Sequence, residues 1–432
     1  MLAGANTPGG GRAGRRTLDH WRGLRPVARG LIAAHTWRSV AQGALSVDFV
    51  LYLRALHWSV AAIGGLITAS ILVGAGLGLV SGPASDRLGR RGFILLYEAL
   101  CALSALGVVL RPGVAEVVLA GLLLGVGRGA NGAGGPVVPV EQAWLAQGGT
   151  EADRTQTFSL NSALTFWGMG AGALLGAAVP LVARILPGPS AYQPLFALNV
   201  GIAVLNYWQI ARLREVPPGR AEAVPPPARV AGALRRRENR ALGLLVAVNA
   251  VNSLGIGIFS PLLPYWFAVR YGAGPAALGP VFALAFLLAG ASSLAAGALA
   301  GRIGVVASVA WVRIGGVALL AALPLAPSFG WAALLYVARS ALNRSSVGAR
   351  QAFGVGLVGD ARRGLASGLN TASQRIPSAL GPTIAGWLMG EGALALPFFL
   401  AAGLQLTYVV LFTTVLGRFA APRPLGAGRA AT

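Results

Sequence analysis

Twelve stretches of this chain are each long and apolar enough to cross a lipid bilayer, and no other feature restricts its fold so strongly. A helix needs about 20 mostly apolar residues to cross the hydrocarbon core. In lipid such a segment must satisfy its own backbone hydrogen bonds, so we expect helices. The stretches lie near 31–56, 60–81, 92–111, 115–146, 157–183, 193–212, 240–268, 276–299, 305–326, 329–351, 363–389 and 393–417. The predicted fold class is an all-α membrane protein with twelve transmembrane helices.

The composition agrees with lipid as the solvent, because only 11% of the residues are charged and 55% are hydrophobic. Soluble domains carry about 25% charged residues. A net charge of +22 would indicate nucleic-acid binding in a soluble protein. Here every basic residue is an arginine, and most lie in clusters between apolar stretches. The charge therefore indicates membrane orientation, and we expect no nucleic-acid partner.

One polar segment divides the chain into two halves. Residues 214–238 contain Pro217–Pro218, Pro225–Pro227 and the run Arg235–Arg237, which cannot satisfy its backbone in lipid. We interpret this segment as a cytoplasmic linker. It separates an N-terminal six-helix bundle from a C-terminal one, and a cytoplasmic tail flanks each bundle. The predicted boundaries are 1–29 for the first tail, 30–213 and 239–417 for the bundles, and 418–432 for the last tail.

The two halves contain matching motifs at nearly constant spacing. Ala62-Ile-Gly64 returns as Ala277-Leu-Gly279, and Gly82-Pro-Ala-Ser-Asp-Arg-Leu-Gly89 returns as Gly297-Ala-Leu-Ala-Gly-Arg-Ile-Gly304. An Arg-x5-Leu-Asn-x-Ala pattern begins at Arg154 and again at Arg363. Two such repeats are typical of secondary transporters, which bind their substrate between the halves. We therefore expect two pseudo-symmetric bundles.

Arginine counts predict the orientation. The clusters at the N-terminus, after the second span and in the linker all fall on one side, whereas the loops of the other side hold one arginine each or none. By the positive-inside rule both termini are cytoplasmic. We expect a bacterial cell (inner) membrane, with no cleaved signal peptide ahead of the first span.

The loop after the second span carries the most specific motif. Its sequence, Gly82-Pro-Ala-Ser-Asp86-Arg87-Leu-Gly89-Arg90-Arg91, resembles the signature G-x-x-x-D-R-x-G-R-R of the major facilitator superfamily (MFS) at every defined position. The resemblance implies the MFS fold and a cytoplasmic latch made by Gly82, Asp86, Arg87, Gly89, Arg90 and Arg91. Asp86 is expected to cap a helix of the other half. The second copy has Gly301 in place of the acid, so the latch is expected to be asymmetric.

Signs of a proton antiporter are incomplete. Arg128 in the fourth span matches the arginine that drug–proton antiporters of the superfamily carry there, but Gln147 replaces the acid that usually ends that helix. We expect Glu141 to take the place of that acid as the partner of Arg90. In the fifth span Ala173 stands where the antiporter motif has proline.

Ionisable residues inside predicted spans are costly and should face a cavity or a partner. The acids are Asp48, Glu98 and Glu141, and Arg128, Arg339 and Arg375 are among the bases. One interpretation is structural, with ion pairs that hold the bundle together. In the other, the three acids are proton-coupling candidates and the three arginines face a substrate cavity, where they would favour an anion.

These features predict a secondary active transporter that moves a small molecule by alternating access. We expect protons as the coupling ion, drug or metabolite efflux as the transport mode, and a monomer. No cofactor, metal site or enzymatic activity is expected: there is no phosphate-binding loop, and three histidines with one cysteine show no metal-ligand spacing. The alternative is a membrane sensor or binding protein that kept the fold without transport.

Overall fold

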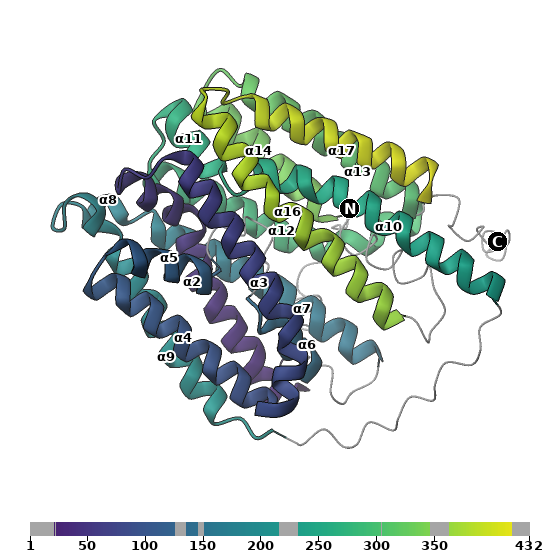
Figure 1. Ribbon diagram of the computed structural model, residues 1–432, viewed down its shortest axis with the longest axis horizontal. Coiled ribbons are helices and arrows are strands. Elements are labelled where there is room, and N and C mark those ends of the chain that lie inside the picture. The colour runs from purple at the N-terminus through teal and green to yellow at the C-terminus, as the bar shows by residue number, and fades with distance from the viewer. Residues whose placement is uncertain are drawn as a thin grey trace, which may run out of the picture.

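The computed structural model describes residues 21, 23–125, 135–145, 151–215, 232–303, 305–345 and 363–416. Within these ranges the chain is helical and contains no strand, which confirms the predicted all-α class. Long helices run side by side, with the first half of the chain at one side of the molecule and the second half at the other (Figure 1).

Local sequence explains where several helices of the first half begin. Pro26 opens the first helix, a position where its missing N–H costs nothing. The Ser59 side chain accepts a hydrogen bond of 3.2 Å from the Ala62 amide and caps the second. The elements are α2 (Pro26–Ala55), α3 (Val60–Leu88), α4 (Arg90–Leu110), α5 (Val114–Leu123), α6 (Val138–Leu145), α7 (Glu151–Gly176), α8 (Val179–Val182), the 3₁₀ helix η1 (Gly188–Tyr192) and α9 (Gln193–Ala211).

The second half follows the same plan. Its elements are α10 (Gly232–Phe259), α11 (Leu263–Tyr271), α12 (Pro275–Ile303), α13 (Val305–Ala322), the 3₁₀ helix η2 (Leu323–Leu325), α14 (Phe329–Ser345), α16 (Arg363–Gly390) and α17 (Leu396–Thr414). Each predicted span overlaps at least one helix. The span expected at 240–268 is broken between α10 and α11, because Pro261 and Pro264 cannot donate backbone hydrogen bonds.

Length and apolar character set a stricter test than helicity. Seven helical segments of the described chain are long and apolar enough to cross a membrane: Val60–Gly82, Arg90–Leu110, Gln156–Val182, Gly188–Ala211, Glu238–Tyr271, Pro275–Ser292 and Leu396–Thr414. Two shorter apolar helices lie at Val114–Leu123 and Val309–Leu325. The full count of twelve crossings stays a prediction.

Helix packing repeats between the halves. In the first half α2 packs on α7 and α4 packs on α9, while in the second half α10 packs on α16 and α13 packs on α17. These are the equivalent pairs if the spans are numbered alike in each half. Between the halves, α3 packs on α16 and α7 packs on α12, which again are equivalent pairs. The structure thus has the internal symmetry that the repeated motifs predict.

The two halves touch at one end of the molecule. At the start of α3, Gly64 packs directly against the Pro382 carbonyl of α16, and Gly386 of α16 packs against the backbone of Val60. The Thr68 hydroxyl donates to the Ala379 carbonyl at 2.6 Å and accepts from Thr383 at 2.8 Å. Gly279 of α12 likewise lies against Ala173 of α7 and against Ala177, which directly follows that helix.

Toward the other end of α3 the helices separate. A side chain placed at Gly76, Gly78 or Gly82 would meet no described residue within 4 Å, and Leu79 is 71% exposed. In Figure 1, α3 and α16 diverge in this direction. The described structure is therefore closed where α3 begins and open where it ends.

Candidate functional site

Four ionisable side chains of the first half meet in its interior. His35 and Arg38 come from α2, Glu98 from α4 and Glu141 from α6, and each is at most 7% exposed. His35 and Arg38 are three residues apart, so they share one face of their helix. Isolated charges are costly inside an apolar bundle, so a cluster of opposite charges is the arrangement expected for such residues.

Arg38 is the centre of this charged cluster. Its Nε donates to Glu98 Oε1 at 2.9 Å and its Nη1 donates to Glu141 Oε1 at 2.7 Å, while Nη2 also contacts Glu98 Oε1. The other oxygen of Glu141 lies 2.8 Å from His35 Nδ1. Asn206 of α9 donates to Glu98 Oε1 at 3.4 Å. Such charge-assisted hydrogen bonds are the strong ones, and here they join four helices.

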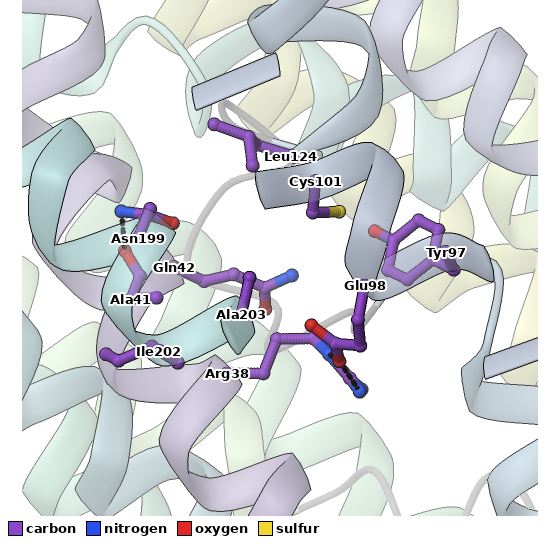
Figure 2. A pocket seen from close by; sticks show the side chains of 10 residues that line it. All are labelled: Arg38, Ala41, Gln42, Tyr97, Glu98, Cys101, Leu124, Asn199, Ile202 and Ala203. Atoms are coloured by element: carbon purple, nitrogen blue, oxygen red, sulfur yellow. Dashed lines mark hydrogen bonds and ion pairs between the residues drawn. The ribbon is translucent and has the colours of Figure 1, made fainter. Parts of the chain in front are cut away.

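A small cavity of about 20 Å³ lies beside the cluster. Arg38, Glu98 and the amide side chains of Gln42 and Asn199 give it a polar wall, which Figure 2 shows from close by. Apolar and aromatic residues form the rest of its lining: Ala41, Tyr97, Cys101, Leu124, Ile202 and Ala203. A space of this size with several polar partners can hold a water molecule.

Asp48 belongs to a different part of the bundle. It lies ten residues beyond Arg38 on α2, a rise of about 15 Å. The residue is 1% exposed, and neither carboxylate oxygen has a hydrogen-bond partner among the described residues. Its Oδ2 lies against Gly176 of α7. The structure therefore brings Glu98 and Glu141 together and keeps Asp48 apart from them.

The predicted cavity arginines are placed only in part. Arg339 of α14 is buried in the second half, where its Nη2 donates to Gln405 Oε1 at 3.0 Å and its guanidinium lies 4.1 Å from the centre of the Phe259 ring. Arg375 is partly buried on α16. Arg128 lies outside the described residues.

The predicted latch loop is shaped by a glycine and held by an acid that follows the end of α9. Gly89, between α3 and α4, has a φ of 76°, a conformation that favours glycine. The amides of Arg90 and Arg91 donate to Glu215 Oε1 at 2.8 Å and Oε2 at 3.1 Å. Glu215 thus caps the N-terminus of α4, where backbone amides lack helical partners. The Asp86 side chain lies outside the described part of the structure.

One predicted contact is wrong. We expected Glu141 to pair with Arg90, but both oxygens of Glu141 are bound by Arg38 and His35. Arg90 Nη1 instead donates to the Ala143 carbonyl at 3.4 Å. The physical reason is depth: Glu141 is buried, so it takes the partners inside the bundle, whereas Arg90 lies at a helix end.

Three residues with evident roles were missed as site candidates in the sequence. They are His35, Arg38 and Glu215, none of which is among the site residues predicted above. The three-residue spacing of His35 and Arg38 was a usable signal, because it places both on one helix face. Within the described residues there is no group of three or more metal-ligating side chains that could hold a metal ion.

Comparisons with known proteins agree with this architecture. The family model described as Major Facilitator Superfamily matches residues 32–342. A curated relative, sugar transporter ERD6-like 7 of Arabidopsis thaliana, is 28% identical over 164 residues, which are 37% of this chain and 33% of the relative. The match thus spans about a third of the relative's length.

Solved structures of transporters share the fold. A mutant of the nucleoside transporter NupG superposes with a TM-score of 0.71 at 11% identity, covering 90% of this chain and 99% of that one. The D-xylose–proton symporter gives 0.66 at 15% identity, covering 90% and 97%. A bacterial homologue of the human lysosomal transporter Spinster, inward-facing and unoccupied, gives 0.65 at 14% identity, covering 91% and 95%. At these identities the likeness shows the fold alone.

Proposed function

The chain belongs to the major facilitator superfamily, and from this premise we propose that it is a secondary active transporter that moves a small molecule by alternating access, driven by protons. The observation that carries the proposal is the contact between the halves. They touch through the equivalent pairs α3–α16 and α7–α12 at one end and separate at the other. Two repeats that rock about a central site need this kind of interface.

The proposed orientation places the open end of the molecule on the cytoplasmic side of the membrane. With both termini in the cytoplasm, α3 begins on the outer side of a bacterial inner membrane and ends on the inner side. The packed glycines and threonines at the start of α3 then close the outer side, which corresponds to an inward-facing state. We keep the boundaries 30–213 and 239–417 for the two bundles, 1–29 and 418–432 for the tails, and 214–238 for the cytoplasmic linker.

The residues divide into three proposed roles. Asp48, Glu98 and Glu141 are the proton-coupling candidates, and Arg128, Arg339 and Arg375 are the substrate-cavity candidates. The latch comprises Gly82, Asp86, Arg87, Gly89, Arg90 and Arg91. Its attachment to Glu215 supports a mechanical role, because the cap ties the loop between α3 and α4 to the end of α9.

For the substrate we propose a small organic metabolite. The names of the similar proteins, a sugar transporter, a nucleoside transporter and a xylose–proton symporter, support a polar solute and a proton as coupling ion. Efflux of a drug or metabolite is the proposed direction, from the antiporter-like Arg128. We propose that the protein works as a monomer.

The test is transport by the purified protein in liposomes. Uptake of labelled D-xylose and a labelled nucleoside is measured with and without an imposed pH gradient, in both directions. We expect flux that collapses when a protonophore is added. Arg90→Ala should lower that flux about tenfold if the latch sets a conformational step of about 1.4 kcal/mol, while Arg111→Ala, an exposed arginine outside the latch, should leave it unchanged.

A different result would favour the sensor. Binding of either solute by thermal shift, with no flux in either direction, would contradict transport and support a membrane sensor on the same fold. Flux that is insensitive to the pH gradient would keep the transporter and refute proton coupling.

A further inference from the structure

We propose that His35, Arg38, Glu98 and Glu141 form one proton-binding unit that holds a single exchangeable proton on the His35 ring. The inference rests on the proposed proton coupling and deepens it, because it assigns the proton to a residue outside the three acids. Glu98 and Glu141 then take part in proton coupling through their charge and do not carry the proton themselves: both carboxylates and the guanidinium stay charged, and the imidazole gains and loses the proton.

The formal charge of the cluster favours a proton on His35. Two carboxylates and one guanidinium leave a formal charge of −1 when His35 is neutral, and zero when His35 is charged. All four side chains are buried, and an unbalanced charge there is costly. The other groups at its border in the described structure, Tyr97, Cys101, Gln42 and Asn206, are ordinarily neutral near pH 7. A purely structural ion pair would have equal numbers of positive and negative charges without the histidine, which this cluster does not.

The hydrogen bonds of the cluster indicate which side chain holds the proton. Glu98 Oε1 accepts from Arg38 and from Asn206, Glu141 Oε1 accepts from Arg38, and Glu141 Oε2 lies 2.8 Å from His35 Nδ1, which donates to it when the carboxylate is ionised. The guanidinium of Arg38 contacts both carboxylates, and a charge-assisted contact of this kind favours the ionised form of each. His35 is then the base that is left to carry the balancing proton. Its Nδ1 already faces Glu141, so the exchangeable proton binds to and leaves from Nε2.

The small cavity beside the cluster can stabilise the unit after the proton has left. It borders the Arg38 and Glu98 side of the cluster, and its Gln42 and Asn199 amides are suitable partners for water. Water in this cavity would solvate Glu98 and make the charge of −1 tolerable after the proton has left. A dry cavity would require the proton. Water in the cavity and a proton on His35 are thus two alternative ways to stabilise the buried charge of the unit.

The position of the unit links the proton to movement. It joins α2, α4, α6 and α9 of the first half, and α2 also packs against α11 and α12 of the second half. A change in the charge between α2 and α6 therefore alters the packing of a helix that contacts both halves. A proton can bias a two-state equilibrium only by such a difference in interaction between the states.

The test reads the charge of the His35 ring directly by NMR of ¹⁵N-histidine-labelled protein in detergent. The chain has three histidines, so a spectrum of His35→Gln assigns the signal. His57 lies in an exposed turn and serves as a control within each spectrum. We expect the ring nitrogens of His35 to show a charged ring in the wild-type protein near pH 7.

Variants test whether the charge count is the cause. Glu98→Gln removes one negative charge and keeps the shape, so the unit balances without the proton and His35 should be neutral where it is charged in the wild type. A change of at least about tenfold in the ratio of charged to neutral ring is expected. Glu141→Gln should act in the same direction and provides a second variant if Glu98→Gln does not fold. Glu391→Gln, an exposed acid far along the chain, should leave the ring unchanged.

Two results would overturn the inference: a His35 ring that stays neutral near pH 7 in the wild type, or one that is as highly charged in Glu98→Gln and Glu141→Gln as in the wild type. These failures are distinct from failure of the proposed function. Proton-driven flux with an unresponsive His35 ring would keep the transporter and refute this site, whereas a responsive ring without flux would keep the site and refute transport.

Discussion

The contact between Gly64 and α16 provides a sharp test of the closed end. A Cβ atom at Gly64 would collide with the carbonyl of Pro382, which is backbone and cannot move aside as a flexible side chain can. The next residue, Gly65, faces no atom within 4 Å of such a Cβ. Gly64→Ala and Gly65→Ala are therefore the same chemical change on the same helix, with and without a steric conflict.

The magnitude follows from overpacking. Forcing a methyl group into a packed contact costs about 1–3 kcal/mol. If the cost falls only on the closed arrangement, it shifts the equilibrium between closed and open by a factor of about 5–150. Replacing glycine by alanine inside a helix also favours the helix by about 0.5–1 kcal/mol. That effect is common to both variants, so a difference between them reports the contact.

The assay is a distance measurement between spin labels across the closed end, for example at the exposed positions Ser59 and Glu391. The single native cysteine, Cys101, is buried, and a Cys101→Ser background would remove it as a second labelling site. We expect the distance distribution to move to longer values in Gly64→Ala and to stay as in the parent in Gly65→Ala. Equal distributions in both variants would refute the role of this contact in holding the end closed.

Three further predictions concern single contacts. Arg38→Met leaves two buried carboxylates without their guanidinium and should lower the free energy of unfolding by about 3–5 kcal/mol. The triple variant Arg38→Met, Glu98→Gln, Glu141→Gln should recover most of this loss. Thermal unfolding in detergent measures both proteins, and an equal loss in the two would contradict the charge argument. Glu215→Ala removes the cap of α4 and should cost about 0.5–2 kcal/mol, seen as faster hydrogen exchange at the Arg90 and Arg91 amides; unchanged exchange would show that the cap contributes nothing. Thr68→Val removes the hydrogen bonds to Ala379 and from Thr383 and should destabilise the closed arrangement by about 0.5–1.5 kcal/mol relative to the open one. The same pair of spin labels measures this shift, and Thr407→Val on α17 is the control.

Most helices could be predicted from the sequence, because the cause of each is local. A segment in lipid has to form its own backbone hydrogen bonds, so apolar length alone is enough to expect a helix. Each predicted range overlaps a helix of the structure. The break between α10 and α11 was harder to predict, since prolines are tolerated in many membrane helices and the consequence depends on the neighbours.

The charged residues show the opposite case. The sequence indicated that buried acids and arginines need partners, but the partners of Arg38 lie 60 and 103 residues away on other helices. The connections between these helices determine which helix faces meet, and no local pattern encodes that. For the same reason Glu141 was assigned to Arg90, although inside the bundle Arg38 and His35 take both of its oxygens.

By itself the sequence determined that this chain is a two-part helical membrane protein with the loop motif of its superfamily, because hydrophobic length, the repeated motifs and the Gly82–Arg91 loop are readable along the chain. Only the tertiary structure decided that Glu98 and Glu141 share Arg38 while Asp48 stays alone, that His35 completes the charge of the cluster, and that Glu215 caps α4. The physical reason is the range of the interactions. Backbone hydrogen bonds in a helix connect neighbours in sequence, whereas buried charges are paired by whatever side chain the packing of distant helices brings within about 3 Å.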